Sequence, residues 1–526
     1  MPLSGTVRIL DGVEAVAPAP SLLNQKSSAR RRRLTSEGVI KAFFGSNALV
    51  AIVVLALITV FLFREGFGFF GQNLKNLRIY RRAGLEFVDI IREKTEQHSA
   101  LSRQLSIIRL EEARSHPETA ALQNFDQFAG AFSDAAEDLN GLVSEASDQA
   151  LALRDTLLGQ VKPGGGQGES SGDAPPPAAE LPQGMVALRS ATEKFGSIAA
   201  VTTSKIDQLL GSPPALADAK ARKSFAQWKS RVREYLAGFP STLQRLRAWD
   251  PHTPVPAYRA ITSFLFGPNW VTASFWQDWY GILPLLVGSI MVALVALLLA
   301  VPLGVAAAIY VSEVASRAEK RLIKPYIEFI SAIPSVVLGF FGIAVVGQAI
   351  RALSQMPFLK WVPFFPISER LNVFTAGCLL ALMAIPTIFT LSEDALRNVP
   401  RGFKEASYAL GANRLQTIGR VLVPASLSGI ISAILLGLGR VIGETMVVLL
   451  CAGNRIAIPD FTQGLGAVFQ PVHTMTGIIA QEMGEVVRGS IHYRALFMVG
   501  LVLFFLTLGI NYVAQKFVGR YRLSIG

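Results

Sequence analysis

The sequence is poor in charge and almost free of cysteine, and both shortages limit the kind of protein it encodes. Charged residues make up 17% of the 526 residues, whereas a soluble domain averages about 25%. Hydrophobic residues make up 51% and occur in long uninterrupted runs, which a soluble core does not need. The two cysteines, Cys378 and Cys451, both lie inside apolar runs, which argues against a disulfide framework. Lipid is therefore the predicted solvent for much of the chain.

The common motifs of nucleotide, metal and covalent chemistry are also missing. No Gly-Lys pair occurs anywhere in the sequence, so the usual phosphate-binding loop of ATP-hydrolysing proteins is absent. The five histidines show no metal-ligand spacing, and no nucleophile–base arrangement stands out. We therefore expect a chain that is not an enzyme, has no metal or cofactor, and leaves any ATP hydrolysis to a partner.

The net charge of +12 is distributed beside the apolar runs rather than in a basic domain. Clusters of Lys and Arg occur at 30–33, 317–324, 397–420 and 516–522. This is the distribution that the positive-inside rule produces in a membrane protein. It argues against nucleic-acid binding, which calls for a basic patch of its own.

Six apolar runs are long enough to cross a bilayer. They lie at about 42–63, 281–311, 327–350, 372–392, 426–452 and 495–514. With the basic loops inside, both termini are predicted to be cytoplasmic. The predicted divisions are a flexible cytoplasmic tail (1–41), a first membrane helix (42–64), a periplasmic insertion (65–265) and the main membrane domain (266–526).

The insertion is polar, with amphipathic segments around 72–115, 119–160, 184–210 and 216–247. A glycine- and proline-rich linker at 162–183 divides it. Trp270, Trp276, Trp279 and Tyr280 follow, and we interpret them as an interfacial aromatic belt where the chain re-enters the bilayer. The insertion is a docking platform for a binding protein, a contact to the envelope, or a spacer, and the sequence leaves these open.

The interior loop 403–424 has the pattern of two short helices around a sharp turn. Gly411 suits the left-handed position after a helix, and Pro424 suits the first turn of the span that follows. Such an element is a rigid knob that fits a groove on a cytoplasmic partner, although an ordinary solvated loop has a similar composition. The residues expected to take part are Arg401, Glu405, Ala406, Ser407 and Gly411.

The fifth predicted span contains two charged residues, Arg440 and Glu444, inside the bilayer, where a charge is costly. Arg440 and Glu444 are four residues apart, which places them on one face of a continuous helix. Arg440 is predicted near the bilayer middle, where an arginine costs about 2.5–3.5 kcal/mol even on a lenient scale. Its planar fork of donors fits phosphate oxygens, and Thr445 adds a hydroxyl. The alternative is a structural Arg–Glu pair between helices. Gly437, Gly439 and Gly443 are expected to permit close helix approach.

Two similar sequences predict breaks in membrane helices. They are Ala332-Ile333-Pro334-Ser335 and Ala384-Ile385-Pro386-Thr387. A proline frees a backbone carbonyl, and the following Ser335 or Thr387 can compensate with a hydrogen bond. Broken helices at matching positions can mark a substrate path, or they can be kinks that serve packing.

These segments together resemble a known family. Glu405-Ala406-Ser407, Gly411 and Leu422-Val423-Pro424 are similar to the EAA loop of ABC importer permeases. Residues 331–337, 392–401 and 437–446 resemble the phosphate-specific permeases, and Gly453-Asn454 with 492–496 favours their PstC type. The similarity covers 40–64 weakly and about 265–526 strongly. The long insertion at 65–265 departs from the family pattern, so the resemblance does not indicate its role.

The resemblance implies an all-α membrane protein with the six-helix type I ABC importer permease fold, in the bacterial inner membrane. It implies a homologous permease partner of the PstA type, two ATPase subunits of the PstB type and a periplasmic phosphate-binding protein of the PstS type. The implied cargo is inorganic phosphate, with Arg440 and Glu444 lining the pathway and the EAA loop docking on the ATPase. Two alternatives stay open: another oxyanion such as molybdate or sulfate as cargo, or a membrane sensor that uses the insertion.

Overall fold

The computed structural model describes residues 22–115, 120–160, 183–359, 361–362 and 364–520, and this part of the chain is almost entirely helical. Six of its helices are long and apolar enough to cross a membrane. This confirms the predicted number of spans. The candidate spans are Gly38–Arg82, Leu283–Val314, Ser335–Ser354, Val373–Arg397, Arg414–Ile442 and Ile491–Val513.

The first helix is much longer than the sequence analysis predicts. Helix α1 runs from Leu22 to Arg82, so residues 22–41 of the predicted tail are helical, whereas residues 1–21 lie outside the described residues. No proline occurs between Pro20 and Pro117, so nothing in this stretch removes a helical hydrogen bond. The helix ends at Gly84, whose φ of 76° favours glycine. A Cβ there would also lie 2.4 Å from Leu188 Cδ1.

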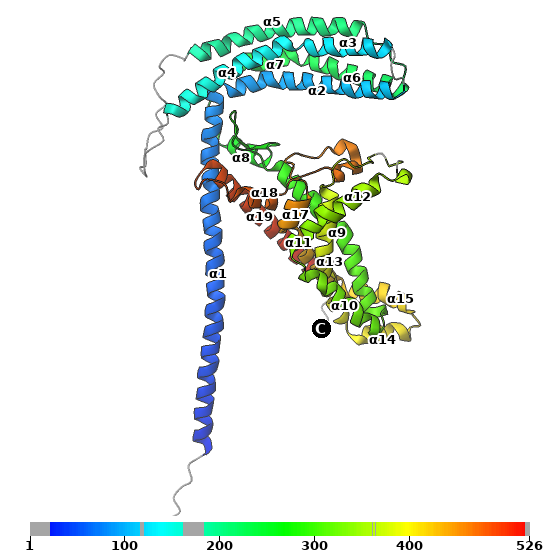
Figure 1. Ribbon diagram of the computed structural model, residues 1–526. Helices are drawn as coiled ribbons and strands as arrows, with labels where there is room; N and C mark the ends of the chain where they lie inside the picture. The colour runs from blue at the N-terminus through cyan, green and yellow to red at the C-terminus, as the bar shows by residue number, and fades with distance from the viewer. Residues whose placement is uncertain (1–21, 116–119, 161–182, 360, 363, 521–526) are drawn as a thin grey trace, which may run out of the picture. The chain divides into compact units, whose positions relative to one another are not determined.

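Among the described residues the insertion contains six helices that pack into one bundle, with some of them end to end (Figure 1). With the end of α1 they occupy the four segments predicted as helical, three of which are split. The split between the last two occurs at Gly238, where Pro240 lies in the first turn of the next helix. The predicted linker lies outside the described residues, except for Gln183, which is helical. The helices are α2 (Leu85–Ser115), α3 (Ala120–Asp134), α4 (Glu137–Gln160), α5 (Gln183–Gly211), α6 (Ala219–Ala237) and α7 (Phe239–Ala248).

An aromatic cluster fills the core of the insertion. Phe125 and Phe132 on α3 are fully buried, and Trp228 on α6 packs edge-on to Phe132 with ring centroids 5.0 Å apart. The indole N–H of Trp228 donates to the Leu101 carbonyl oxygen at 3.0 Å, which satisfies its buried polar atom. The insertion therefore has a hydrophobic core of its own.

The predicted aromatic belt is wrong, because most of its residues are buried within the protein. Trp270, Trp276 and Tyr280 are each less than 9% exposed, in a hairpin of strands β1 (Trp270–Val271) and β2 (Trp279–Tyr280) that follows α8 (Tyr258–Leu265). Asp89 on α2 accepts hydrogen bonds from the Trp276 indole at 3.0 Å and from the Tyr80 hydroxyl at 2.5 Å. These aromatics fasten the insertion to the hairpin instead of marking a lipid boundary.

The membrane domain is organised around α13 (Val373–Arg397). Two-thirds of its most apolar window (67%) is buried, against 28% or less in the other spans, and it packs on α9, α10 and α16. The other elements follow the hairpin in chain order. They are α9 (Leu283–Ile309), η1 (Tyr310–Val314), α10 (Arg317–Ala332), α11 (Ser335–Phe341), η2 (Gly342–Val346), α12 (Gly347–Ser354), η3 (Pro357–Leu359), α14 (Arg401–Ala409), α15 (Arg414–Thr417), η4 (Ile418–Leu422), α16 (Val423–Ile442), α17 (Met446–Cys451), η5 (Phe461–Phe469), α18 (Met475–Glu482) and α19 (Ile491–Arg520).

Two span boundaries differ from the prediction. The third span begins at Ser335 rather than at 327, because Pro334 ends the preceding helix α10, an amphipathic helix that begins with a Ser316 capping box. The helical stretch of the fifth span begins at Arg414, before the predicted 426. Within it α16 begins at Val423, and Pro424 lies in the first turn of α16, as predicted.

His98 gives the insertion a pH-dependent stability. Its Nε2 lies 2.8 Å from the Phe132 carbonyl oxygen, and its Nδ1 and the nearby Tyr235 hydroxyl are buried without a hydrogen-bond partner among the described residues. Burial lowers the pKa of His98 below its usual 6.5. The unfolded chain therefore takes up a proton at a higher pH than the folded chain does. Stability falls as the pH drops below about 6.5, by at most about 1.4 kcal/mol per pH unit.

We expect faster hydrogen exchange in residues 85–115 and 120–134 of the full chain at pH 5.5 than at pH 7.5, after correction for the intrinsic rate. In the variant His98→Gln, whose amide still donates to Phe132 but does not titrate, this difference should disappear. An equal pH dependence in the variant would contradict the assignment.

Candidate translocation site and coupling loop

The predicted knob between the fourth and fifth spans is present. Helix α14 ends before Gly411, whose φ of 80° is the left-handed conformation that glycine adopts freely. Helix α15 follows, with a capping box between Asn413 and Gln416. The buried hydroxyls of Ser407 and Thr417 lie 2.9 Å apart and join the two helices. The predicted turn at Gly411 is confirmed, and Ser407 has a structural role inside the loop.

The loop is fastened to the preceding interior segment by Glu313. Its Oε1 lies 2.7 Å from Lys404 Nζ, and the carboxylate side chain is 9% exposed. The Arg414 guanidinium donates to the backbone carbonyl of Glu313. Lys404 and Arg414 come from opposite sides of the turn, so both halves of the loop are held to η1. Sequence reasoning missed Glu313, because its pairing depends on a contact across 91 positions.

The outer face of the loop is exposed and apolar at its tip. Leu410 is 89% exposed and Leu415 is 76% exposed, while Arg401, Glu405 and Ala406 are exposed beside them. Exposed leucines ringed by charged residues are typical of a protein contact surface. The loop therefore presents a preformed surface, to which α15, the first turn of the fifth candidate span, contributes Leu415.

Arg440 lies near the end of α16 and contacts the neighbouring helix α13. Its Nη1 donates to the Thr387 hydroxyl at 3.3 Å, and the Arg440 side chain is exposed within this chain. Among the described residues no carboxylate forms an ion pair with it. The Thr387 hydroxyl thus faces another helix. The structure joins two residues that the sequence analysis placed in separate groups.

Glu444 does not continue the helix of Arg440, contrary to the prediction of a shared face. Helix α16 ends at Ile442, and Gly443, Glu444 and Thr445 form a break before α17. The Glu444 carboxylate accepts from the Met446 amide at 3.2 Å, and its carbonyl accepts from the Thr476 hydroxyl at 2.8 Å. Thr445 caps α17 through its carbonyl, which the Leu449 amide contacts at 3.0 Å. At this break the Thr476 hydroxyl of α18 satisfies the freed Glu444 carbonyl, and the Glu444 carboxylate satisfies the Met446 amide.

Only one of the three predicted packing glycines lies at a close helix contact. A Cβ on Gly437 would lie 2.8 Å from Ile388 on α13, whereas one on Gly439 would meet nothing within 4 Å and one on Gly443 would meet only backbone oxygens of its own helix. Gly437 therefore allows α16 to approach α13 beside Arg440 and Thr387. The prediction is wrong for Gly439 and Gly443, because helix rotation decides which glycine meets a neighbour.

The two predicted proline breaks differ. Pro334 separates α10 from α11, and its carbonyl accepts from the Val337 and Leu338 amides as the next helix begins at Ser335. Pro386 lies inside the continuous helix α13, so the prediction of a break there is wrong. Helices α9 and α16 pack on α13, and α13 stays continuous through Pro386.

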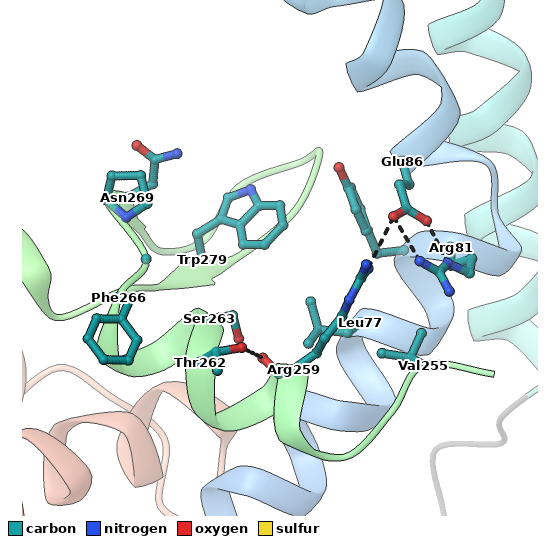
Figure 2. Close-up of a pocket in the computed structure, with 13 residues that line it drawn as sticks. Leu77, Arg81, Glu86, Val255, Arg259, Thr262, Ser263, Phe266, Asn269 and Trp279 are labelled. Atoms are coloured by element: carbon teal, nitrogen blue, oxygen red, sulfur yellow. Dashed lines mark hydrogen bonds and ion pairs between the residues drawn. The ribbon is translucent and has the colours of Figure 1, made fainter. Parts of the chain in front are cut away.

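A cavity of about 500 Å³ lies away from all of these residues. Figure 2 shows it beside the end of α1, α8 and the hairpin, with Glu86 bridging Arg81 and Arg259. The Arg81 contact is bidentate, at 2.6 and 2.9 Å. The ion pairs of Glu86 with Arg81 and Arg259 join the start of α2 to the end of α1 and to α8. The charges that line this cavity are therefore already paired, and the cavity is separate from the candidate translocation site.

Comparison with known proteins identifies the family. The model of the family "Binding-protein-dependent transport system inner membrane component" matches residues 300–520. A probable ABC transporter permease protein, YqgH of Bacillus subtilis, is 37% identical over 242 residues, which cover 45% of this chain and 72% of YqgH. The chain belongs to the binding-protein-dependent inner-membrane transport component family. It is a multi-pass membrane permease, and the predicted type I ABC importer permease fold is confirmed.

Further relatives of this permease carry a more specific name. The phosphate transport system permease protein PstC of Haemophilus influenzae is 31% identical over 277 residues, covering 50% of this chain and 84% of that protein. PstC of Pasteurella multocida is 30% identical, covering 50% and 82%. Among solved structures, an inward-facing MetNI methionine ABC transporter is 18% identical with a TM-score of 0.33, covering 46% of this chain and 95% of that one. The family match begins at residue 300 and leaves out the insertion.

The permease can be tested for the attachment of its loop. Replacing Lys404 with methionine keeps the apolar stem but removes the ion pair to Glu313, which is worth about 1 kcal/mol in a half-buried setting. We expect several-fold faster hydrogen exchange in residues 401–410 of the purified chain. Arg401→Met is the matched control, since that exposed cation on the same helix has no such partner, and equal effects of both variants would refute the anchoring role of Glu313.

Proposed function

We propose that this permease forms half of the pathway of an ATP-driven importer of inorganic phosphate. The observation that carries the proposal is Arg440, a cation in a membrane span whose side chain is exposed and contacts a hydroxyl instead of a carboxylate. A cation in such a place requires a polar cavity or an anionic substrate. The resemblance to PstC proteins of two bacteria supports phosphate as that anion.

Arg440 and Glu444 have complementary chemistry for phosphate. The Nη atoms of arginine offer two parallel donors that fit two phosphate oxygens, and the Thr387 hydroxyl beside it adds a third polar group. At neutral pH phosphate still carries at least one proton, and the Glu444 carboxylate is a suitable acceptor for it. The break at 443–445 gives this carboxylate a backbone that is not fixed by a helix. The site therefore recognises both the charge and the proton of the ion.

The loop of α14 and α15 is the proposed contact to the ATPase. Its exposed Leu410 and Leu415 form the contact surface, Arg401, Glu405 and Ala406 surround it, and Lys404–Glu313 carries a displacement of the loop to η1 and α9. A push on the loop then reorients the spans in alternating access. The proposed assembly contains a homologous PstA-type permease, two PstB-type ATPase subunits and a periplasmic PstS-type phosphate-binding protein. Both termini are proposed to be cytoplasmic in the bacterial inner membrane, with the insertion on the periplasmic side.

The site assignment is tested by phosphate uptake into proteoliposomes that hold the complete complex. Arg440→Ala should lower uptake by roughly 100-fold, because two charge-assisted hydrogen bonds at about 1.5 kcal/mol each are lost. ATP hydrolysis and assembly are measured in parallel and should survive. Arg488→Ala, which removes an exposed cation from the loop between α18 and α19, serves as control. Wild-type uptake by the Arg440 variant would remove it from the pathway, and a wild-type complex that ignores phosphate would refute the cargo.

Phosphate differs from sulfate and molybdate because it still carries a proton at neutral pH. Sulfate and molybdate are fully ionised at neutral pH, so they offer Glu444 no donor and face its negative charge. Glu444→Gln replaces this acceptor with a neutral amide. We expect the ratio of phosphate to sulfate transport to fall by roughly tenfold or more, since a hydrogen bond to a charged group is worth about 1.5–3 kcal/mol.

The same uptake assay, with labelled phosphate and labelled sulfate in competition, measures this ratio. Glu485→Gln, on an exposed loop beyond α18, is a matched control. A Glu444→Gln variant with an unchanged ratio would show that the carboxylate plays no part in selecting the ion. Preferential transport of sulfate or molybdate by the wild type would favour the alternative cargo.

A further inference from the structure

A second cavity, of about 460 Å³, lies at the membrane end that carries the coupling loop. Helices α10 and α13 and the residue Ser312 line it. Four of its lining side chains are cationic and two are carboxylates. These side chains are Lys320, Arg321, Lys324, Arg397, Glu328 and Glu393. The cavity thus carries an excess of positive charge, and neither the proposed pathway nor the coupling surface uses it.

Part of this positive charge is already neutralised by Glu393. This carboxylate is 3% exposed and lies 2.8 Å from Lys324 Nζ and 3.7 Å from Arg397 Nη1. A buried carboxylate needs such partners, because an unpaired buried charge is costly. Lys324 and Arg397 line the cavity, but their charges are already paired with Glu393.

Lys320 and Arg321 keep donors available for a ligand. The ammonium of Lys320 donates to the Ser312 carbonyl at 2.9 Å, which uses one of its three N–H groups. Arg321 donates through Nε to the Arg317 carbonyl at 3.4 Å, which leaves the two Nη groups of the guanidinium. Among the described residues no carboxylate forms an ion pair with either cation. Both side chains line the cavity, so an anion that enters it meets several unpaired donors.

The opposite face of α10 is apolar, and the described residues leave it uncovered. Leu322, Tyr326 and Phe329 recur at helical spacing and are 60%, 68% and 66% exposed, and no residue of α10 is fully buried. Ile323 and Ile327 pack on the helices beneath. A helix with one apolar and one basic face, at the end of a membrane span, is typical of the membrane interface. The apolar face then lies against acyl chains, and the basic face is at the level of the headgroups.

We infer that this cavity binds the phosphate headgroup of an anionic phospholipid, with Lys320 and Arg321 as its ligands. Basic pockets between membrane helices on the cytoplasmic side are suited to anionic headgroups. The three exposed apolar residues of the same helix supply the contact for the lipid tails, which a free phosphate ion does not need. The inference rests on the orientation proposed above and adds a lipid site to the proposed transporter.

The location of the site connects lipid binding to the coupling loop. Lys320 holds the Ser312 carbonyl, and the next residue, Glu313, holds Lys404 of the loop at 2.7 Å. A headgroup that engages Lys320 therefore acts on the segment that carries the loop. We expect anionic lipid to change the ATP hydrolysis of the complete complex in membranes, and this effect to disappear when the two ligands are removed.

The test is native mass spectrometry of the purified complete complex titrated with phosphatidylglycerol or with phosphatidylcholine of the same acyl chains. The wild type should bind phosphatidylglycerol more tightly. The double variant Lys320→Gln/Arg321→Gln should lose roughly tenfold or more of that affinity, since each cation near the surface contributes about 1 kcal/mol. The control Arg317→Gln/Arg420→Gln removes two cations at the same membrane end but outside the cavity, and should retain the preference. Size-exclusion chromatography of each complex establishes that it is assembled.

Three results would overturn the inference. Equal binding of the two lipids by the wild type would mean that the headgroup is not recognised, as would happen if the partner permease covers α10. Undiminished phosphatidylglycerol binding by the cavity variant would place the lipid elsewhere. Displacement of the lipid by millimolar inorganic phosphate would make the cavity a free-anion site. None of these readings depends on the transported ion, so a failure of phosphate uptake by the same complex is a separate result.

Discussion

The hydrogen bond from the Thr476 hydroxyl to the Glu444 carbonyl, 2.8 Å long, is the contact on which the candidate site depends. Backbone groups inside a membrane domain must be satisfied within the protein, so a helix can end there only where another element supplies a partner. Helix α18 supplies one. This allows α16 to end shortly after Arg440, so that Glu444 no longer follows the helical path. Arg440 and Glu444, which the sequence places one helical turn apart, therefore do not share a helix face.

The central helix α13 contributes a residue both to the candidate ion site and to the basic cavity. Thr387, in its middle, meets Arg440 where Gly437 allows α16 to approach closely. Glu393, one and a half turns further, neutralises Lys324 and Arg397 in the basic cavity. Both groups belong to α13, which is the most buried span. The candidate ion site and the basic cavity thus share one helix.

The loop of α14 and α15 depends on polar contacts rather than on a hydrophobic core. The bond between Ser407 and Thr417 keeps α14 against α15, and Glu313 attaches both to η1. Leaving the apolar side chains Leu410 and Leu415 outside is costly unless a partner covers them. Internal polar contacts make this possible, since the loop keeps its shape without burying its leucines. The insertion is built in the opposite way, around buried aromatic rings.

The sequence alone determined the six spans, the turn at Gly411 and the family, because apolar length, glycine conformation and a long motif are local properties. It did not determine where α16 ends, which of Gly437, Gly439 and Gly443 meets a neighbour, or that Pro386 stays within its helix. It also placed Trp270 and Trp276 at a lipid boundary, whereas Trp276 is buried against the insertion and Trp270 is buried beside Tyr280 and Glu482. These outcomes depend on helix rotation and on partners such as Thr476, Glu313 and Asp89, which come from distant positions in the chain. Only the tertiary structure decides which distant side chain is close enough to satisfy a freed carbonyl or a buried charge.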